Sequence, residues 1–547
     1  MMRLSKSFFN KTVLRKDLTR YWPLWVVFTI LTVDLSDIEM FYGGALESVA
    51  YATESMTLYN FIFALVAAVC MFGDLSNRRL CNCLHTLPLR RETWFATHLL
   101  SATVCWAAPV LVKTLIYLTG LQQSWYLAFA FLGLMAVQFL FFLSTAVLSV
   151  MCTGTKLAAT VMYGLINLGS WLIYYMVINF YQPLIKGIWL SEEWAVWLSP
   201  VSMLASTEWI QVNHTELWYK STFAGFDPKC WYFGVLGALA VVFFALSLLA
   251  YRKRKLECAG DFVAFRWLRP VLWLLISLCF GMLIQGLGLL SGEGTLFLLL
   301  GLVVGGLLAQ IMVTKSSKHA LKGLLKGAIL AGIVGISIVV VAIDPMGATR
   351  WTPAPEEVEY VRIADDIYFD ETYSAYINVQ NYYDAGDIAQ IVKAHENLID
   401  EGLTEADTYS TEYYAYREIH ITYYLKDGRK VVRQYYYPKD SQADKLLKPL
   451  MSRAEYVLGY ESWPVFIEKT HSVTVECNGE EYQLDQFQST ELLKVIKTDC
   501  DTGTWDDRQM WDGYCIIKVD DKWIIPSSGC VQTYKWLNIN VLYQSEK

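Results

Sequence analysis

Stretches of about 20 mainly apolar residues, the length that crosses a bilayer's hydrocarbon core, constrain this chain more than any other feature. We place them at Tyr21–Asp34, Thr57–Gly73, Ala96–Thr119, Trp125–Cys152, Lys156–Tyr181, Trp231–Tyr251, Val271–Leu290, Leu296–Val313 and Leu324–Ile343. The whole chain of 547 residues is 54% hydrophobic, more than is usual in a soluble protein. We therefore expect a polytopic α-helical membrane protein of about nine spans, the first of which is short and can continue through residues 35–44.

The charges alternate along the chain in a way that predicts topology. Basic residues concentrate in one set of loops (Arg78, Arg79, Arg90, Arg91, Lys156, Arg252–Lys255, Lys315, Lys318 and Lys322), and acidic residues in the other set. Short loops rich in Lys and Arg stay on the cytoplasmic side. We therefore expect a cell-membrane protein with a cytoplasmic N-terminus and everything after Asp344 extracytoplasmic. Because the basic charge sits in short loops, no nucleic-acid partner is needed to explain it.

Residues 1–20 hold six basic residues and one acid, and no cleavable signal peptide is recognised. Two interpretations stay open for this segment. It is either a positive flank that fixes the N-terminus inside, or an interfacial helix leading into the first span.

The loop Asp74–Phe95 carries four arginines against Asp74 and Glu92. Pro88 stands near a first helical position and is followed by helix formers, which predicts a short helix. Composition alone favours an ordinary basic loop. The order His85-Thr86-Leu87-Pro88-Leu89-Arg90-Arg91-Glu92, however, resembles the H-S-L-P-[IL]-x-R-E pattern of ABC type-2 exporter permeases.

A second motif is Tyr251-Arg252-Lys253-Arg254-Lys255-Leu256-Glu257-Cys258-Ala259-Gly260-Asp261. Physically it is a run of four cations followed by a glycine turn. Through Tyr251, Arg254, Glu257 and Gly260 it resembles the Y-x-x-R-x-x-E-x-A-G signature of a Gram-positive branch of the same permeases.

The resemblance implies a domain organisation, partners and a contact site. The domains would be an interfacial segment (1–20), a six-helix ABC permease core (21–260) with a coupling helix (77–95) and an outer interfacial segment (182–229), three further helices (261–347) and an extracytoplasmic α+β domain (348–547). The partners would be ABC ATPase subunits, which bind ATP and Mg, and a second permease in a homo- or heterodimer. The ATPase contact would be made by Leu87, Pro88, Leu89, Arg90, Arg91, Glu92 and Trp94.

The C-terminal part alternates strand-like and helix-like stretches, and it is strongly acidic. From Trp351 onward the sequence has 35 acidic and 19 basic residues. Asp387–Leu403 has apolar residues at helical spacing, and Lys426-Asp427-Gly428-Arg429 marks a hairpin. Glu359–Phe369, Tyr373–Val379, Tyr414–Leu425, Val431–Tyr437, Cys515–Val519 and Lys522–Ile525 are predicted strands, and Lys445–Ser452 and Ser489–Lys497 predicted helices. Together they define an α+β domain.

Several single residues invite a functional interpretation. Lys113, inside the third span, either faces a substrate path or extends its ammonium to the outer interface, and we favour the second reading. Cys477, Cys500, Cys515 and Cys530 allow two disulfides with three connectivities, or buried thiols. Gly301, Gly305, Gly323 and Gly327 have the small-xxx-small spacing of close helix contacts, although glycine merely tolerated in lipid is an almost equal alternative. Gln138, Asn167, Gln285 and Gln310 are expected to be interhelical hydrogen-bond partners.

Three functions are weighed. Because no phosphate-binding G-x-x-x-x-G-K-[ST] loop occurs, we expect a transport subunit without its own ATPase site, cofactor, metal or enzyme activity, moving a peptide, antibiotic or lipid. A sensing or resistance module, in which the outer domain binds an antimicrobial peptide or envelope component, is the alternative. A membrane-bound enzyme is third, but the sequence offers it no catalytic constellation.

Overall fold

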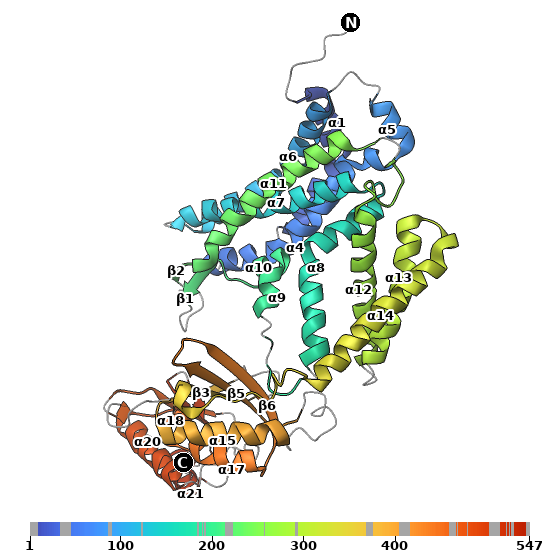
Figure 1. The fold of residues 1–547 in the computed structure, drawn as a ribbon. Coiled ribbons are helices and arrows are strands. Elements are labelled where there is room, and N and C mark those ends of the chain that lie inside the picture. Colours follow the sequence, from blue (N-terminus) through green and yellow to red (C-terminus); the bar gives the residue numbers. More distant parts are fainter. Residues whose placement is uncertain are drawn as a thin grey trace. The chain divides into compact units, whose positions relative to one another are not determined.

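The computed structural model describes the chain except residues 1–8, 33–44, 86–89, 122–123, 183–184, 189, 191–192, 214–221, 256–257, 290–293, 368–375, 404–415, 459–465, 468, 478–479, 503–514, 521, 525, 527–529 and 543–547. It divides into two compact units (Figure 1). The helical unit comprises Met1–Ile178 and Ser191–Ile336. The C-terminal unit comprises Ser337–Lys547 together with Asn179–Leu190.

Eight long apolar helices confirm a multi-pass membrane protein. They are α4 (Ala45–Met71), α6 (Arg91–Gly120), α7 (Tyr126–Cys152), α8 (Lys156–Tyr181), α11 (Trp231–Lys253), α12 (Leu268–Leu289), α13 (Gly294–Thr314) and α14 (Ala320–Ile343). The predicted first span is instead the 11-residue helix α2 (Trp22–Thr32) in the described residues. At 1.5 Å per residue this described part is about 16 Å long, about half of the 30 Å of hydrocarbon, and the predicted continuation through residues 35–44 lies outside the described residues. Helix α4 begins at Ala45, twelve residues before the predicted start at Thr57. The predicted start was too late because Glu47 and Glu54 interrupt the apolar pattern.

Close glycine contacts hold the last three long helices together. A Cβ on Gly301 would lie 2.9 Å from the Cα of Gly281 on α12, and one on Gly306 would lie 2.6 Å from the Cα of Gly327 on α14. Such distances leave no room for a side chain, so the small-residue spacing does mark helix-helix contacts. Gly305 and Gly323 are equally tight against Ser277 and Gln310.

A buried polar network joins α4, α6 and α7. Trp106 Nε1 donates to Asn60 Oδ1 (2.8 Å), Asn60 Nδ2 donates to Gln138 Oε1, and Gln138 Nε2 donates to Thr57 Oγ1 (2.7 Å). All four side chains are buried. The predicted role of Gln138 as an interhelical hydrogen-bond partner is confirmed, and Asn167 does the same toward Thr145 (3.2 Å).

The segment predicted to be interfacial, residues 182–229, is divided between the units. In the helical unit it forms α9 (Glu193–Leu198), α10 (Pro200–Ala205) and a hairpin of β1 (Ile210–Asn213) and β2 (Thr222–Phe226). Trp194 is exposed there, but Trp209 is fully buried, with Nε1 donating to the Leu204 carbonyl (3.1 Å). Trp209 is therefore a core residue and not an interfacial one.

The C-terminal unit is α+β, as predicted, and contains the same topology twice. The first copy is β3 (Val358–Ile367), β4 (Tyr376–Tyr382), α15 (Ala385–Glu401), β5 (Tyr416–Leu425), β6 (Lys430–Pro438) and α17 (Gln442–Met451). The second is β7 (Val473–Cys477), β8 (Glu480–Gln483), α20 (Gln486–Asp501), β9 (Cys515–Val519), β10 (Lys522–Ile524) and α21 (Val531–Leu537). Each copy forms an antiparallel sheet of equivalent strand order, β4-β3-β5-β6 and β8-β7-β9-β10, so the unit is a tandem ββαββα repeat.

The equivalence of the copies extends to individual positions. Helices α15 and α20 are each capped by an aspartate, Asp384 and Asp485, whose side chains accept from backbone N–H groups of the first turn. Buried residues then follow at the same offsets from the cap: Ile388, Ile391, Val392, His395 and Leu398 in α15; Ser489, Leu492, Leu493, Ile496 and Asp499 in α20. Each copy packs this helical face on its own sheet to form a separate core.

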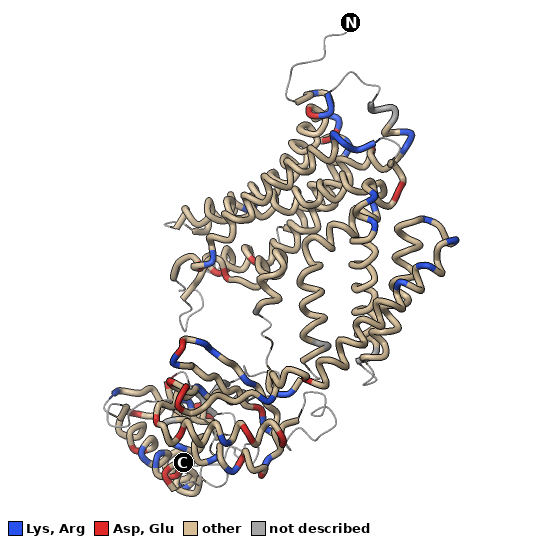
Figure 2. The backbone as a smooth tube through the Cα atoms, viewed as in Figure 1, with Lys and Arg blue, Asp and Glu red and all other residues tan. Residues whose placement is uncertain are grey.

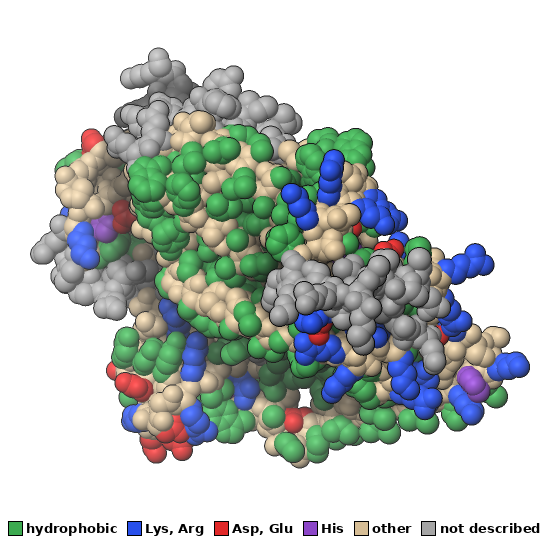
Figure 3. Space-filling model, turned by 90° about the horizontal axis from the view of Figure 1, so that it is seen from above, with side chains coloured by type: hydrophobic (Ala, Val, Ile, Leu, Met, Phe, Trp, Pro, Cys, Tyr) green, Lys and Arg blue, Asp and Glu red, His purple; other side chains and the backbone are tan. Residues whose placement is uncertain are grey.

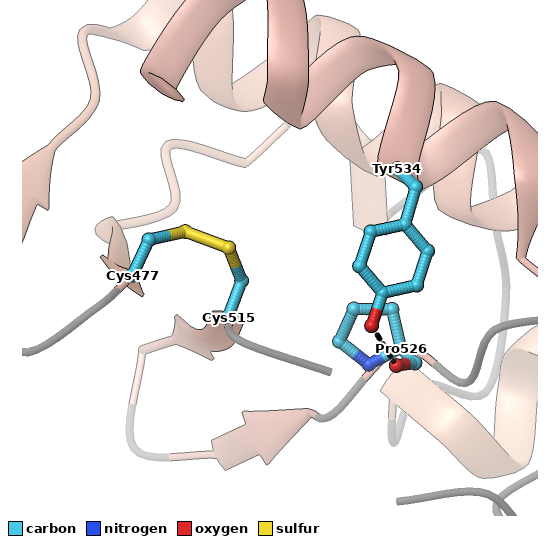
Figure 4. The surroundings of a disulfide bond; sticks show 4 residues. All are labelled: Cys477, Cys515, Pro526 and Tyr534. Atoms are coloured by element: carbon cyan, nitrogen blue, oxygen red, sulfur yellow. Dashed lines mark hydrogen bonds between the residues drawn. A yellow bond between two sulfur atoms is a disulfide. The ribbon is translucent and has the colours of Figure 1, made fainter. Parts of the chain in front are cut away.

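One disulfide, Cys477–Cys515, joins β7 to β9 in the second copy (Figure 4). The two cysteines are register partners in the sheet. Cys500 and Cys530, which could have made a second bridge, are buried thiols in the same core. In the same view Tyr534 of α21 donates to the Pro526 carbonyl (2.8 Å), which ties α21 to the segment after β10.

Candidate functional site

The two sequence motifs come together at one end of the helical unit, in a cluster that we call the basic junction: Leu75, Arg78, Arg91, Glu92, Tyr251, Arg252, Arg254, Ala259 and Asp261. Arg252 Nη2 lies 3.0 Å from Glu92 Oε1. Arg91 Nη1 donates to the carbonyls of Tyr251 (3.3 Å) and Arg252 (3.1 Å), and its guanidinium lies over the Tyr251 ring. The start of α6 is thereby tied to the end of α11.

Arg254 is the buried centre of the basic junction, with 6% of its surface exposed. Its Nη1 donates to the carbonyls of Val150 (2.7 Å) and Met151 (3.2 Å), and its Nη2 to that of Leu75 (3.0 Å). The last carbonyls of a helix lack intrahelical partners, so one guanidinium here satisfies the end of α7 and the turn after α4 together. Burial lowers the pKa of Arg254 from its ordinary value.

A close turn-to-turn contact completes the basic junction. Gly260 N donates to the Gly154 carbonyl (2.7 Å), and a Cβ on Gly154 would lie 2.1 Å from the Cys258 carbonyl oxygen. Gly260 itself has φ +91°, a conformation that only glycine adopts without strain. Arg78 then reaches across from α5 (Arg78–His85), where Nε donates to the Ala259 carbonyl (2.7 Å).

The structure describes only some of the residues predicted for the ATPase contact and for the second motif. Leu87, Pro88, Leu89 and Glu257 lie outside the described residues. Arg90 is exposed, whereas Trp94 is half-buried with its ring 4.4 Å from that of His98. Arg91, Tyr251 and Arg254 are engaged within the chain itself. Gly154 and Arg78 were not predicted, because only the folded chain brings them beside the second motif.

The helix α1 (Lys11–Arg20) is attached to α6 by buried polar groups. Its Asp17 is 5% exposed, with Oδ2 lying 2.7 Å from His98 Nδ1 and accepting from Ser101 Oγ (2.9 Å). Asn10 caps α1 through its side chain, and its own N–H donates to Thr97 Oγ1 (3.0 Å). Of the two readings of the N-terminal segment, a helix is therefore observed.

Lys113 is buried on α6, with 1% of its surface exposed. Its ammonium donates to the Thr32 carbonyl at the end of α2 (2.7 Å) and lies 5.7 Å from the centre of the Tyr117 ring. The expectation that this ammonium extends outward to an interface is wrong, because the ammonium is buried and bound to a backbone carbonyl inside the protein.

The basic end of the helical unit is visible in the distribution of charge. Lys and Arg gather on α1, on α5 and on the turn between α13 and α14, while the helix shafts are nearly uncharged (Figure 2). Figure 3, which looks onto that end, shows the same concentration of basic side chains on its surface. A basic helix end facing one side of a bilayer is the pattern of a positively charged cytoplasmic face.

A buried polar centre lies in the first copy of the C-terminal repeat. His395 Nδ1 is 3.0 Å from Tyr423 OH, and its Nε2 is 2.9 Å from Tyr435 OH. Burial and the nearby Arg433 lower the pKa of His395 to about 3, and burial raises that of Tyr435 to about 12. His395 is thus a core histidine whose two ring nitrogens both have hydrogen-bond partners.

A cleft of about 930 Å³ lies where the two copies of the repeat meet. It is lined by the end of β4, the start of α15, the end of α17, α18 (Ala454–Leu458) and the end of α20, specifically by Gln380, Asn381, Tyr382, Tyr383, Asp387, Lys448, Pro449, Ser452, Arg453, Tyr456, Cys500 and Asp501. Arg453 pairs there with Asp387 through two hydrogen bonds (2.6 and 2.9 Å). Sequence analysis had not found this cleft.

No group of three or more His, Cys, Asp or Glu side chains is placed to hold a metal in the described part of the chain. Comparisons with models of protein families, with curated proteins and with solved structures give no match. Fold and sites together define a multi-pass membrane protein with eight long apolar helices and a C-terminal α+β region that carries a disulfide.

Proposed function

We propose that the chain is the transmembrane permease subunit of an ATP-binding-cassette exporter, similar to the type-2 permeases. The basic junction carries this proposal. Two separate sequence motifs that resemble that family are joined there by Arg91, Glu92, Arg252 and Arg254. An element that receives force from another protein must be fixed to the helices that it moves, and these contacts link the start of α6 to the end of α11, and the end of α11 to α7.

The proposed mechanism needs no chemistry on this chain. Separate ATPase subunits would bind ATP and Mg and close on each other. Their movement would press on residues 87–94, and Glu92 and Arg91 would pass it to α11 through Arg252 and Tyr251. The higher affinity of nucleotide for the closed ATPase pair supplies the energy for the shift. A path for a peptide, antibiotic or lipid would then open beside a second permease subunit.

The proposed topology has a cytoplasmic N-terminus and an extracytoplasmic C-terminal unit. The basic helix ends support it through the positive-inside rule (Figure 2). The Cys477–Cys515 disulfide is in keeping with an oxidising location for the C-terminal unit.

The proposal is tested by purifying the tagged full chain from its native membranes and measuring ATP hydrolysis. We expect an ATPase with a phosphate-binding loop to co-purify, and Arg90→Glu on the exposed start of α6 to reduce the co-purified activity at least about tenfold. Lys322→Glu is the matched control, since Lys322 is also exposed and basic but lies outside residues 77–95. Hydrolysis by the chain alone, or an equal effect of the two variants, would refute the proposal.

A second candidate function is a sensing or resistance module, which the cleft in the C-terminal unit favours. In that case the C-terminal unit would capture an antimicrobial peptide or a cell-envelope component, and transport would be secondary. Photo-crosslinking of labelled antimicrobial peptides to the full chain separates the two: labelling confined to the C-terminal unit supports sensing, and labelling confined to the helical unit supports a plain exporter.

A further inference from the structure

The cleft between the two repeat copies has the edge of a β-sheet as one of its walls. Four consecutive residues, Gln380, Asn381, Tyr382 and Tyr383, line it. Gln380, Asn381 and Tyr382 are the last three residues of β4, and Tyr383 follows directly. Successive side chains of a strand point to opposite faces of the sheet, so consecutive residues line one cavity where the edge of the strand faces it. Among the described strands β4 is an edge strand, since its sheet has the order β4-β3-β5-β6.

We propose that the cleft binds an extended peptide, which adds to the edge of β4 as a fifth strand. An edge strand offers backbone N–H and C=O groups at the spacing of another strand, and peptides bind to such edges by main-chain hydrogen bonds. The three residues of β4 that line the cleft extend, together with Tyr383, over about 13 Å, which matches a peptide segment of roughly four residues.

The side walls of the cleft fit a peptide of mixed charge. Lys448 and Arg453 are balanced by Asp387 and Asp501, so the cleft does not select a polyanion or a polycation. Tyr383, 61% exposed, adds aromatic surface on which apolar side chains of a peptide can pack, whereas Tyr456 is buried in the wall of the cleft.

The volume agrees with this occupant. About 930 Å³ is at the upper end of the range of about 300–1,000 Å³ found for small-ligand sites. This inference rests on the C-terminal fold and not on the proposed transport function. Peptide binding can fail while ATP-driven transport holds, and the reverse is equally true.

The test uses hydrogen exchange of the full chain in detergent micelles. One sample receives about 1 mM of a degenerate hexapeptide pool, and a second receives the same pool N-methylated at every amide. The first pool should slow amide exchange in residues 376–383 about tenfold if the effective dissociation constant is about 100 μM. The N-methylated pool, which keeps the side chains but cannot donate main-chain hydrogen bonds, should have no effect.

Internal and matched controls sharpen the result. Strand β8 is the equivalent edge strand of the second copy and should exchange at the same rate in all samples. Tyr383→Ala should reduce the protection of β4, whereas Tyr416→Ala, which removes a tyrosine packed against Tyr436 of β6 on the other side of the sheet, should not. Equal protection by both pools would assign the cleft to side-chain recognition, and no protection by either would reject it as a peptide site. Either result overturns strand addition.

Discussion

Acidification should destabilise the first copy of the C-terminal repeat through His395. The unfolded chain holds this imidazole at its ordinary pKa of 6.5, whereas burial and Arg433 lower it to about 3 in the folded chain. The unfolded state therefore binds more protons between these two values, and stability rises with pH across that window. This contribution to instability is absent above about pH 6.5 and grows as the pH falls toward 3.

The size of this loss of stability follows from the shift in pKa, since each pKa unit corresponds to about 1.4 kcal/mol. Between pH 7 and pH 4, about two and a half units of the shift come into effect, so His395 alone should lower the free energy of opening of this copy by about 3 kcal/mol. His395 is fully buried, with Tyr423 and Tyr435 on its two nitrogens, so solvent screening should not reduce this value much.

The assay is hydrogen exchange of the β5 and β6 amides in the full chain, corrected for the intrinsic effect of pH. In the His395→Gln variant the side chain at this position cannot take up a proton between pH 7 and pH 4. Over that range the free energy of opening should therefore fall by about 3 kcal/mol less in the variant than in the wild type. Acidic groups titrate in both proteins and cancel in the comparison. His471→Gln, in the second copy, is the matched control and should keep the wild-type slope. Parallel slopes for wild type and His395→Gln would refute this reasoning.

Three further predictions follow from the packing. Gly154→Ala should lower the melting temperature of the helical unit, because its Cβ would lie 2.1 Å from the Cys258 carbonyl oxygen. Gly133→Ala, which has open space around it, should be neutral or slightly stabilising. Equal shifts of the melting temperature in the two variants would contradict the close turn contact. Cys477→Ser should weaken the second copy by about 4 kcal/mol, from the 38-residue separation it closes, measured as faster exchange of the β9 amides; a reducing agent should then have no added effect. Arg252→Glu should uncouple ATP hydrolysis from transport with little loss of stability, since the Arg252–Glu92 ion pair is exposed. Adding Glu92→Arg should restore the coupling. If the double variant stays uncoupled, the ion pair has no role in coupling.

The membrane helices were predictable because burial in lipid requires long unbroken apolar runs. From Ala96 to Ile343 the predicted ends fall within a few residues of those observed. The errors lie near polar side chains. Glu47 and Glu54 interrupted the apolar pattern of the first half of α4, and the described part of α2 ends at Thr32, where the buried Lys113 donates to the carbonyl. Hydropathy measures transfer to lipid and is silent about such partners.

The basic junction was only half predictable for a related reason. The motifs at residues 85–92 and 251–261 stand out as sequence, but the pairing of Glu92 with Arg252, the burial of Arg254 and the approach of Gly154 depend on contacts between residues about 100 to 180 positions apart. A guanidinium that satisfies three helix-end carbonyls has the same sequence signature as one that is solvated at the headgroups. Only the fold distinguishes these two uses of a basic residue.

The tandem repeat was invisible in the sequence because the copies conserve where residues are buried and not which residues are buried. His395 takes the place of Ile496, and Leu398 that of Asp499. Each polar replacement has found its own partners: His395 binds two tyrosines, and Asp499 accepts from the N–H groups of Gln532 and Thr533 at the start of α21. A buried polar group requires such partners, so the residues around each of these side chains differ between the copies as well. The two cores are therefore built from different sets of contacts although they share the helix cap, the spacing of buried positions and the strand order.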